Sequence, residues 1–123
     1  MRILVLSRDL IVASRILAEA SATGQAARLV SEPIALPPPA EVDLLFVNWA
    51  DRDPGWAAAL LAWRDRVPPS ASPTLVLYGP HTDIEAHAEA RSAGLGPMLA
   101  RSKLVADLPE LLRVRYDVAP EDH

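Results

Sequence analysis

The sequence contains no cysteine among its 123 residues, and this absence excludes several kinds of chemistry at once. Disulfide bonds, thiolate catalysis, cysteine phosphotransfer and zinc–thiolate sites all require a cysteine side chain. A chain without disulfides fits a reducing compartment, so we expect a cytoplasmic protein.

The sequence also lacks a basic excess and a long apolar run. The 12 Lys and Arg residues are outnumbered by 16 Asp and Glu residues, which gives a net charge of -4. A general attraction to nucleic acid or to an anionic membrane is therefore not expected. No apolar run approaches the length of a membrane span, and the opening stretch MRILVLSRDL reaches Arg8 and Asp9 too early for a signal peptide.

The length and the alternation of patterns indicate one α/β domain over residues 1–123. Short runs rich in Leu, Val and Ile alternate with segments whose apolar residues recur at helical spacing. We expect strands at 2–7, 26–30, 43–47, 74–78 and 97–100, and helices at 10–23, 55–67, 84–93 and 108–116.

Capping residues place the ends of these helices. Asp9 is the expected cap of the first helix, and Asp53 that of the second, with Pro54 in its first turn. The stretch 82–85 reads T-x-x-E, the pattern of a capping box. Pro109 fits the last helix if it lies in the first turn, where no backbone N–H is needed.

One helix is missing from the alternation. Three consecutive prolines, Pro37 to Pro39, cannot donate backbone hydrogen bonds, so no full helix fits between the second and third strands. The pattern predicts a mostly parallel sheet with helices on both faces. Ligands of such sheets gather at the carboxyl ends of the strands, which makes those ends the candidate functional region.

Four stretches in order resemble a response-regulator receiver domain over nearly the whole chain. They are MRILVLSRDL, VDLLFVN, PTLVLYG and AGLGPMLARS, and the last part also resembles uncharacterised bacterial receiver-like proteins. The resemblance implies a flavodoxin-like, doubly wound parallel sheet of five strands in the order 2-1-3-4-5. The second helix would be shortened or replaced by the Pro-rich loop.

The resemblance also assigns positions, and this chain departs from the family at each of them. The two metal-binding acids of a receiver fall on Ser7 and Arg8, with Asp9 nearby, and the phosphoacceptor aspartate falls on Asn48. The conserved serine or threonine falls on Tyr78, and the conserved lysine falls on Arg101. We call the set the degenerate pocket: Ser7, Arg8, Asp9, Asn48, Tyr78 and Arg101.

These departures predict that the chain cannot be phosphorylated in the standard way. An amide at position 48 has no anionic oxygen to attack a phosphoryl group. A guanidinium at position 8 would repel the metal that neutralises phosphoryl oxygens. We therefore expect no metal, no cofactor and no enzymatic activity.

Simpler interpretations of the same residues remain open. Asn48 is favoured as a strand-end residue that bonds to local backbone, rather than as a ligand contact. Arg8 either stands in for the metal or helps to bind a phosphate-like anion, or it forms an ion pair with Asp9, Asp51 or Asp53. The functional role and the ion pair are equally expected. Asp51 is a candidate ligand or partner contact; its simpler interpretation is a solvated loop residue.

Aromatic and histidine residues supply the other candidate contacts. Trp49 follows a strand end and is expected to be partly exposed, as a contact residue would be. Trp56 and Trp63 lie seven apart and are expected to pack against the sheet. His81 is expected to point toward the pocket, but the cluster around it, HTDIEAH, is better explained by helix capping than by a metal site.

Three functions compete at this point. The leading hypothesis is a non-phosphorylatable pseudo-receiver, a signalling or scaffolding domain that binds a protein partner or itself. The resemblance places that contact near residues 88–112, on the fourth helix, fifth strand and fifth helix of a receiver. The alternative is a small-molecule or anion sensor that uses Ser7, Arg8, Asn48 and Arg101. An enzyme is a remote third, because no catalytic arrangement is visible.

Overall fold

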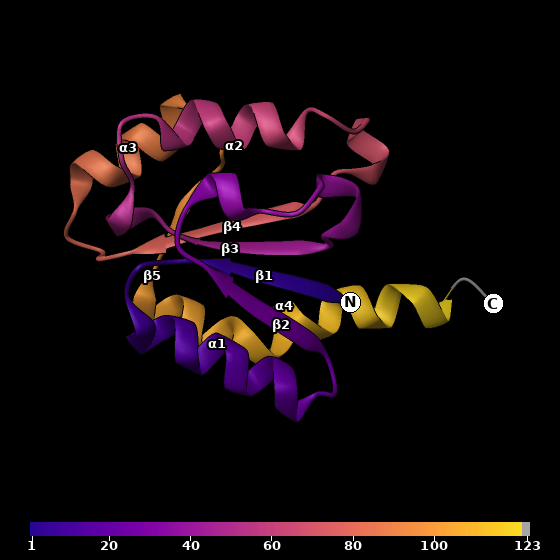
Figure 1. Ribbon diagram of the computed structural model, residues 1–123. Helices are drawn as coiled ribbons and strands as arrows, with labels where there is room; N and C mark the ends of the chain where they lie inside the picture. The colour runs from indigo at the N-terminus through magenta and orange to yellow at the C-terminus, as the bar shows by residue number, and fades with distance from the viewer. Residues whose placement is uncertain (122–123) are drawn as a thin grey trace.

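The computed structural model describes residues 1–121 of the chain, and the side chains of residues 1–113. Its centre is a parallel sheet of five strands in the order β2-β1-β3-β4-β5 (Figure 1). This order confirms the expected flavodoxin-like fold. The strands are β1 (Arg2–Leu6), β2 (Ala26–Val30), β3 (Leu44–Asn48), β4 (Thr74–Gly79) and β5 (Met98–Ala100).

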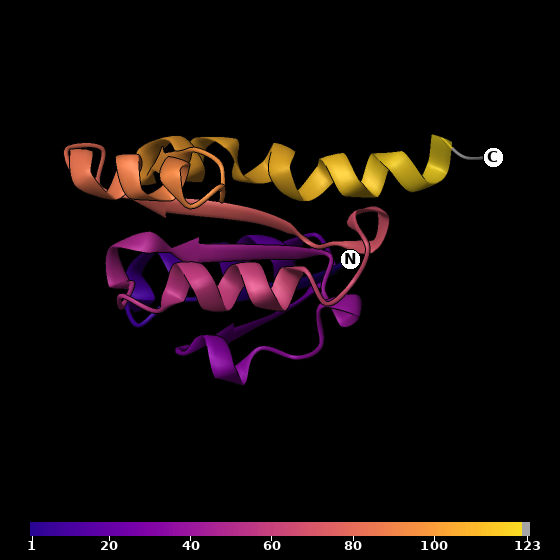
Figure 2. The same ribbon diagram turned by 90° about the horizontal axis from the view of Figure 1, so that it is seen from above.

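Helices cover both faces of the sheet. In Figure 1, α1 and α4 lie on one face, and α2 and α3 lie on the other; Figure 2 shows the same layers from above. Within residues 1–121 no helix combines the length and the apolarity needed to cross a membrane. The helices are α1 (Leu10–Ala22), α2 (Trp56–Arg64), α3 (Ile84–Ser92) and α4 (Arg101–Glu121).

The central strand β3 is buried along its whole length, as expected of an apolar run inside a doubly wound sheet. Because side chains alternate along a strand, β3 contributes to two separate cores. Phe46 packs with the apolar residues of α1 and α4. Leu45 and Val47 pack with Trp56, Leu60 and Trp63 of α2, which confirms that both tryptophans face the sheet.

The Pro-rich connection replaces a helix, as expected. Residues 31–43 contain two single 3-10 turns, η1 (Pro33–Ala35) and η2 (Pro39–Glu41). Leu36 and Val42 anchor the connection in the core beside α2. The indole Nε1 of Trp63 donates a hydrogen bond of 2.8 Å to the carbonyl oxygen of Pro37, so the connection is fixed to α2 by polar as well as apolar contacts.

Three expectations about helix ends are wrong. Helix α2 has Gly55 at its N-cap, without a side-chain hydrogen bond, because the carboxylate of Asp53 binds Arg8 instead. Helix α3 is capped by Asp83, which accepts a 3.0 Å hydrogen bond from the backbone N–H of Ala86; Thr82 is not the cap. Helix α4 begins directly after β5, so Pro109 lies in its interior rather than in its first turn.

Replacement of Trp63 tests the anchoring of the Pro-rich connection. We expect Trp63→Phe to lower the free energy of unfolding by about 1 kcal/mol more than Trp56→Phe. Both substitutions remove the same part of a buried indole, but Nε1 of Trp56 has no hydrogen-bond partner among the described residues. Urea denaturation measures the difference; equal losses in the two variants would show that the bond to Pro37 contributes nothing.

Candidate functional site

The carboxyl ends of three neighbouring strands bring polar side chains to one face of the sheet. In the strand register Leu6 pairs with Val47, so Ser7 lies level with Asn48, and Asn48 itself pairs with Tyr78. All three side chains point to the α1/α4 face, because they continue the alternation of Val5 and Phe46. Ser7, Asn48 and Tyr78 are all buried. The structure thus brings Ser7, Asn48 and Tyr78 of the degenerate pocket together.

Asp51 is the centre of the hydrogen-bond network at this site. Its Oδ2 accepts hydrogen bonds from the backbone N–H of Arg8 at 2.7 Å and from Nδ2 of Asn48 at 2.9 Å. The Ser7 hydroxyl lies 3.3 Å from the same oxygen. Asp51 is therefore not the solvated loop residue that the sequence suggested, and it ties β1 to the 3-10 turn η3 (Trp49–Asp51).

Asn48 bonds to side chains rather than to the backbone. Its Nδ2 also donates to the hydroxyl of Ser7 at 3.2 Å, while its Oδ1 has no partner among the described residues. The expected backbone bonds of Asn48 are therefore replaced by a link between two strand ends and the following turn. The amide acts here as a donor to a carboxylate, a role that a carboxylate at position 48 could not fill.

Asp9 serves the first helix, as expected. Its Oδ1 accepts a 2.8 Å hydrogen bond from the backbone N–H of Ile11, which caps α1. Its backbone is held by Ser7: the hydroxyl of Ser7 donates to the Asp9 carbonyl oxygen at 2.7 Å and accepts from the Asp9 N–H at 3.0 Å. The carboxylate of Asp9 therefore has a structural use at the helix N-terminus.

The guanidinium of Arg8 forms ion pairs at the rim, which decides between the two interpretations of this residue. Nη2 lies 2.6 Å from Oδ2 of Asp53 and 2.7 Å from Oε1 of Glu32. The hydrogen bond that Arg8 donates to Asp53, and then the one it donates to Glu32, raise the pKa of Arg8 above its ordinary value. The hydrogen bond from Arg8 lowers the pKa of Asp53. The guanidinium also lies over the ring of Trp56, 5.3 Å from its centroid.

Glu32 is a partner that the sequence analysis did not identify. It follows β2, and the strand order places the end of β2 beside the end of β1, where Arg8 lies. The predicted strand order could therefore have identified Glu32 as a neighbour of Arg8.

Tyr78 lies near the carboxyl end of β4 and is fully buried. Its hydroxyl makes no hydrogen bond of acceptable geometry with the described residues. Burial raises the pKa of Tyr78 to about 12, and the nearby Ser7 hydroxyl opposes the rise in part. Arg101, at the start of α4, is exposed and makes no hydrogen bond or ion pair with the described residues; its charge also opposes the rise.

The expectation that Trp49 is exposed is wrong. Its side chain is 0% exposed, and Nε1 donates a 3.1 Å hydrogen bond to the carbonyl oxygen of Ala86 in α3. Arg52, another residue that the sequence analysis missed, lies over the Trp49 ring and pairs with Glu89 at 2.7 Å. Trp49 therefore fixes η3 to α3 and is not available as a surface contact.

His81 is exposed in the turn after β4 and makes no hydrogen bond or ion pair with the described residues. The structure therefore does not join it to the degenerate pocket. Within the part of the chain that the structure describes, no group of three or more His, Asp and Glu side chains could hold a metal ion.

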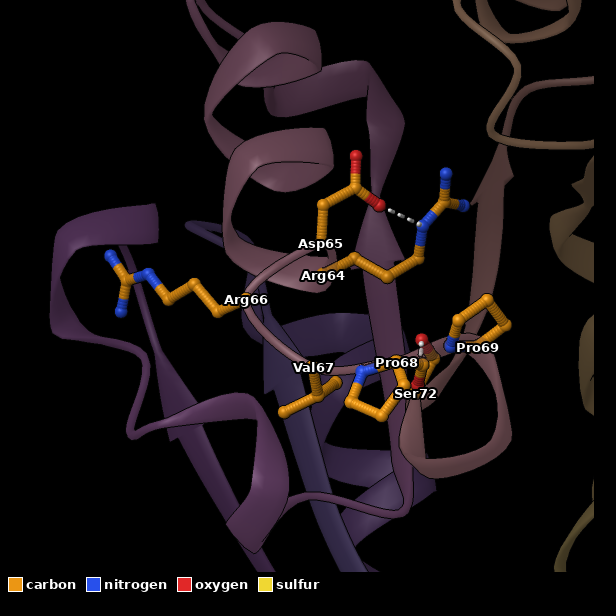
Figure 3. A pocket seen from close by; sticks show the side chains of 7 residues that line it. All are labelled: Arg64, Asp65, Arg66, Val67, Pro68, Pro69 and Ser72. Carbon is orange, nitrogen blue, oxygen red and sulfur yellow. Dashed lines mark hydrogen bonds and ion pairs between the residues drawn. The ribbon is translucent and has the colours of Figure 1, made fainter.

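Hollows in the surface do not coincide with the degenerate pocket. A hollow of about 350 Å³ beside it is lined by Arg52, Asp53, Pro54 and Glu89. Another, of about 650 Å³, lies at the opposite end of the sheet, between α2 and β4 (Figure 3). It is lined by Arg64, Asp65, Arg66, Val67, Pro68, Pro69 and Ser72. The polar side chains at the strand ends thus form hydrogen bonds with one another, and they do not line either hollow.

Comparisons with known proteins support the fold. No family model matches the sequence, and no curated protein matches it significantly. A solved structure described as an atypical orphan response regulator, with a new phosphorylation-independent regulatory mechanism, matches with a TM-score of 0.62. The match covers 94% of each chain at 14% sequence identity. At this identity the likeness shows a receiver-like fold and nothing finer.

Removal of the Asp51 carboxylate tests its central position. We expect Asp51→Ala to lower the free energy of unfolding by about 2 kcal/mol, because the buried amide of Asn48 and the backbone N–H of Arg8 lose their acceptor. Asp65→Ala is the matched control, since Asp65 is an exposed aspartate whose contact is a 3.7 Å pair with its neighbour Arg64. Urea denaturation of both variants makes the comparison; similar small losses would contradict the network.

Replacement of Tyr78 tests its buried hydroxyl. An unfolded tyrosine ionises near pH 10, but in the folded chain the pKa of Tyr78 is about 12. The unfolded state therefore releases this proton first, and the stability present below pH 10 falls as the pH rises toward 12. We expect Tyr78→Phe to reduce that alkaline loss and to be no less stable than the wild type at neutral pH.

Denaturation at several pH values and the ultraviolet absorbance of the phenolate measure both effects. Since the chain has 2 tyrosines, the variant also identifies which titration belongs to Tyr78. An unchanged alkaline slope in the variant would contradict the assignment.

Proposed function

We propose that this chain is a non-phosphorylatable, receiver-like signalling domain that acts through protein contacts and catalyses no reaction. The observation that carries the proposal is the set of hydrogen bonds around Oδ2 of Asp51. This oxygen takes donors from Arg8 and Asn48, with the Ser7 hydroxyl also close, so three residues of the degenerate pocket are already engaged with one carboxylate.

The absence of a nucleophile at position 48 supports the proposal first. The amide nitrogen of Asn48 donates to Ser7 and Asp51, and an amide oxygen carries no charge with which to attack phosphorus. Phosphoryl transfer to a receiver needs an ionised carboxylate at the end of β3. The neighbouring carboxylate of Asp51 accepts hydrogen bonds that hold it in the loop, which opposes its use as a substitute.

The bonds that the neighbouring carboxylates of Asp9 and Asp53 already make also support the proposal. Asp9 caps α1, and Asp53 binds the guanidinium of Arg8. A divalent cation would have to displace these bonds and approach the fixed positive charge of Arg8. Metal-dependent phosphorylation is therefore disfavoured by charge as well as by the missing nucleophile.

The similar solved structure is consistent with this proposal, since it is described as a response regulator with a phosphorylation-independent mechanism. We further propose that the protein is cytoplasmic and that its contact surface includes α3, β5 and the first half of α4, up to Leu112. This surface corresponds to the fourth helix, fifth strand and fifth helix of receivers, which commonly associate there. The contact would be with a protein partner or with a second copy of the chain.

An anion sensor is the weaker candidate. Arg101 is exposed and unpaired among the described residues, which favours it. However, the Asp51 carboxylate lies among the donors that an anion would need, and like charges repel at such short distances. An anion would have to displace Asp51 from the Arg8 N–H and from Asn48.

Thermal melts with magnesium and beryllofluoride, a phosphoryl analogue, test the proposal. We expect the wild-type melting temperature to stay unchanged, because no free carboxylate is present at the end of β3. The variant Arg8→Asp/Asn48→Asp restores carboxylates at two family positions, so we expect its melting temperature to rise with the analogue by mass action. Arg15→Asp, which adds a carboxylate on the exposed side of α1, is the control for non-specific metal binding.

A rise in the wild-type melting temperature, or a mass increase after incubation with acetyl phosphate, would contradict the proposal. Mass spectrometry of an Asp51→Asn variant would then show whether Asp51 has become the acceptor. Inorganic phosphate added alone distinguishes the anion sensor, which it would stabilise against heat.

A further inference from the structure

The missing helix leaves one side of the sheet partly uncovered. Parallel sheets are normally covered by helices on both faces, but here the thin Pro-rich connection lies where the second crossover helix would pack. Arg28 of β2 lies level with Leu4 of β1, on the same face as α2, and is exposed. The Arg28 side chain is thus accessible beside the Pro-rich connection, whereas Leu4 is buried.

A groove lies between the Pro-rich connection and α2. Its volume is about 310 Å³, and η1 contacts α2 along it. Ile34, on its wall, is 95% exposed, whereas Trp63, which also lines it, is buried. We call it the Pro-rich groove; its lining residues are Pro33, Ile34, Leu36, Ala59, Ala62, Trp63 and Arg66.

A second hollow borders the same connection. It has a volume of about 370 Å³ and includes Leu4 and Arg28 of the sheet together with Pro37 and Glu41 of the connection. The two hollows therefore flank residues 33–41. Ile34 lies on the wall of the Pro-rich groove, so an exposed apolar side chain adjoins a hollow that a partner's side chain could fill.

Two unpaired cations accompany these hollows. The guanidinium groups of Arg28 and Arg66 are exposed and make no ion pair or hydrogen bond with the described residues. By contrast, Arg8 and Arg52 are each held by carboxylates. Figure 3 shows the Arg66 side chain pointing away from Arg64 and Asp65, so neither of these neighbours contacts its guanidinium group.

We propose that the Pro-rich groove, with Arg28 and Arg66, binds a segment of a partner protein that carries an aliphatic side chain flanked by carboxylates. The aliphatic side chain would fill the groove beside Ile34 and Trp63. The carboxylates would pair with the two arginines, which gives the surface its preference for an acidic segment. The proposal rests on the proposed function as an interaction domain and names a surface separate from α3, β5 and α4.

Charge also disfavours a second copy of this chain as the occupant. In a symmetric dimer the same patch meets itself, so the unpaired arginines of both copies would be brought into one interface. Like charges across an interface oppose association. A partner with acidic residues removes this conflict.

Selection from a displayed library of random peptides tests the proposal. The wild-type protein is the target, and Ile34→Asp/Arg66→Glu is the counter-target that removes peptides bound elsewhere. We expect the enriched peptides to combine Leu, Ile or Val with Asp or Glu. A synthetic copy of the most enriched peptide should lose about tenfold or more of its affinity for Arg66→Glu and for Ile34→Ser. Its affinity should also fall as salt is raised.

Leu10→Ser and Arg15→Glu are the matched controls, because they change an exposed apolar residue and an exposed arginine on α1. They should leave the affinity unchanged. The proposal is overturned if no peptide is enriched against the counter-target, if enriched peptides lack carboxylates, or if Arg66→Glu binds them as well as the wild type. Sedimentation in which Ile34→Ser converts a dimer to a monomer would overturn it in favour of a second copy.

The melts with magnesium and beryllofluoride remain a separate test. They probe phosphorylation chemistry without any partner, so failure of the peptide selection leaves their result intact. Melting curves of Ile34→Ser and Arg66→Glu alone establish that both variants fold, as expected for substitutions of exposed residues.

Discussion

The carboxylate of Asp51 is the group on which the arrangement of the strand ends depends. One of its oxygens joins the end of β3, through Asn48, to the loop after β1, through the backbone of Arg8. The 3-10 turn η3, which carries Asp51, is itself fixed to α3. Trp49 donates a hydrogen bond to Ala86, and Arg52 forms an ion pair with Glu89. A buried or half-buried carboxylate is stable only when its oxygens have donors, so these residues constrain one another.

This internal carboxylate changes what the receiver-like fold can do. In such a fold the strand ends form a site because parallel strands expose their polar termini at one edge. Here the polar groups at that edge bind Asp51, and Arg8 binds Asp53 and Glu32 beside it. Donors and charges that would hold a metal and a phosphoryl group are satisfied within the chain. Under the proposed function, recognition would fall to the surfaces of the helices and of the Pro-rich connection.

Replacement of one crossover helix has a comparable effect on the other side of the sheet. Three prolines hold the connection extended, and Trp63 fixes it to α2. Ile34 of this connection is exposed, and Arg28 of the neighbouring strand β2 is exposed and not paired among the described residues. The feature that departs most from the regular alternation of strands and helices is therefore also the one that creates an open surface.

The sequence by itself determined the alternation of strands and helices, the missing helix and the residues that end each strand, because apolar periodicity and proline act locally. The strand order was expected only from the resemblance to receiver domains. It could also show that Asn48 lacks a nucleophile, since that follows from the residue type. Only the tertiary structure decided how these side chains are used. Trp49 is buried because α3 supplies an acceptor, Asp53 leaves the helix cap because Arg8 is near, and Asp51 gains its donors from β1 and β3. Such partners lie far apart in the chain, and no local pattern encodes the distance between them.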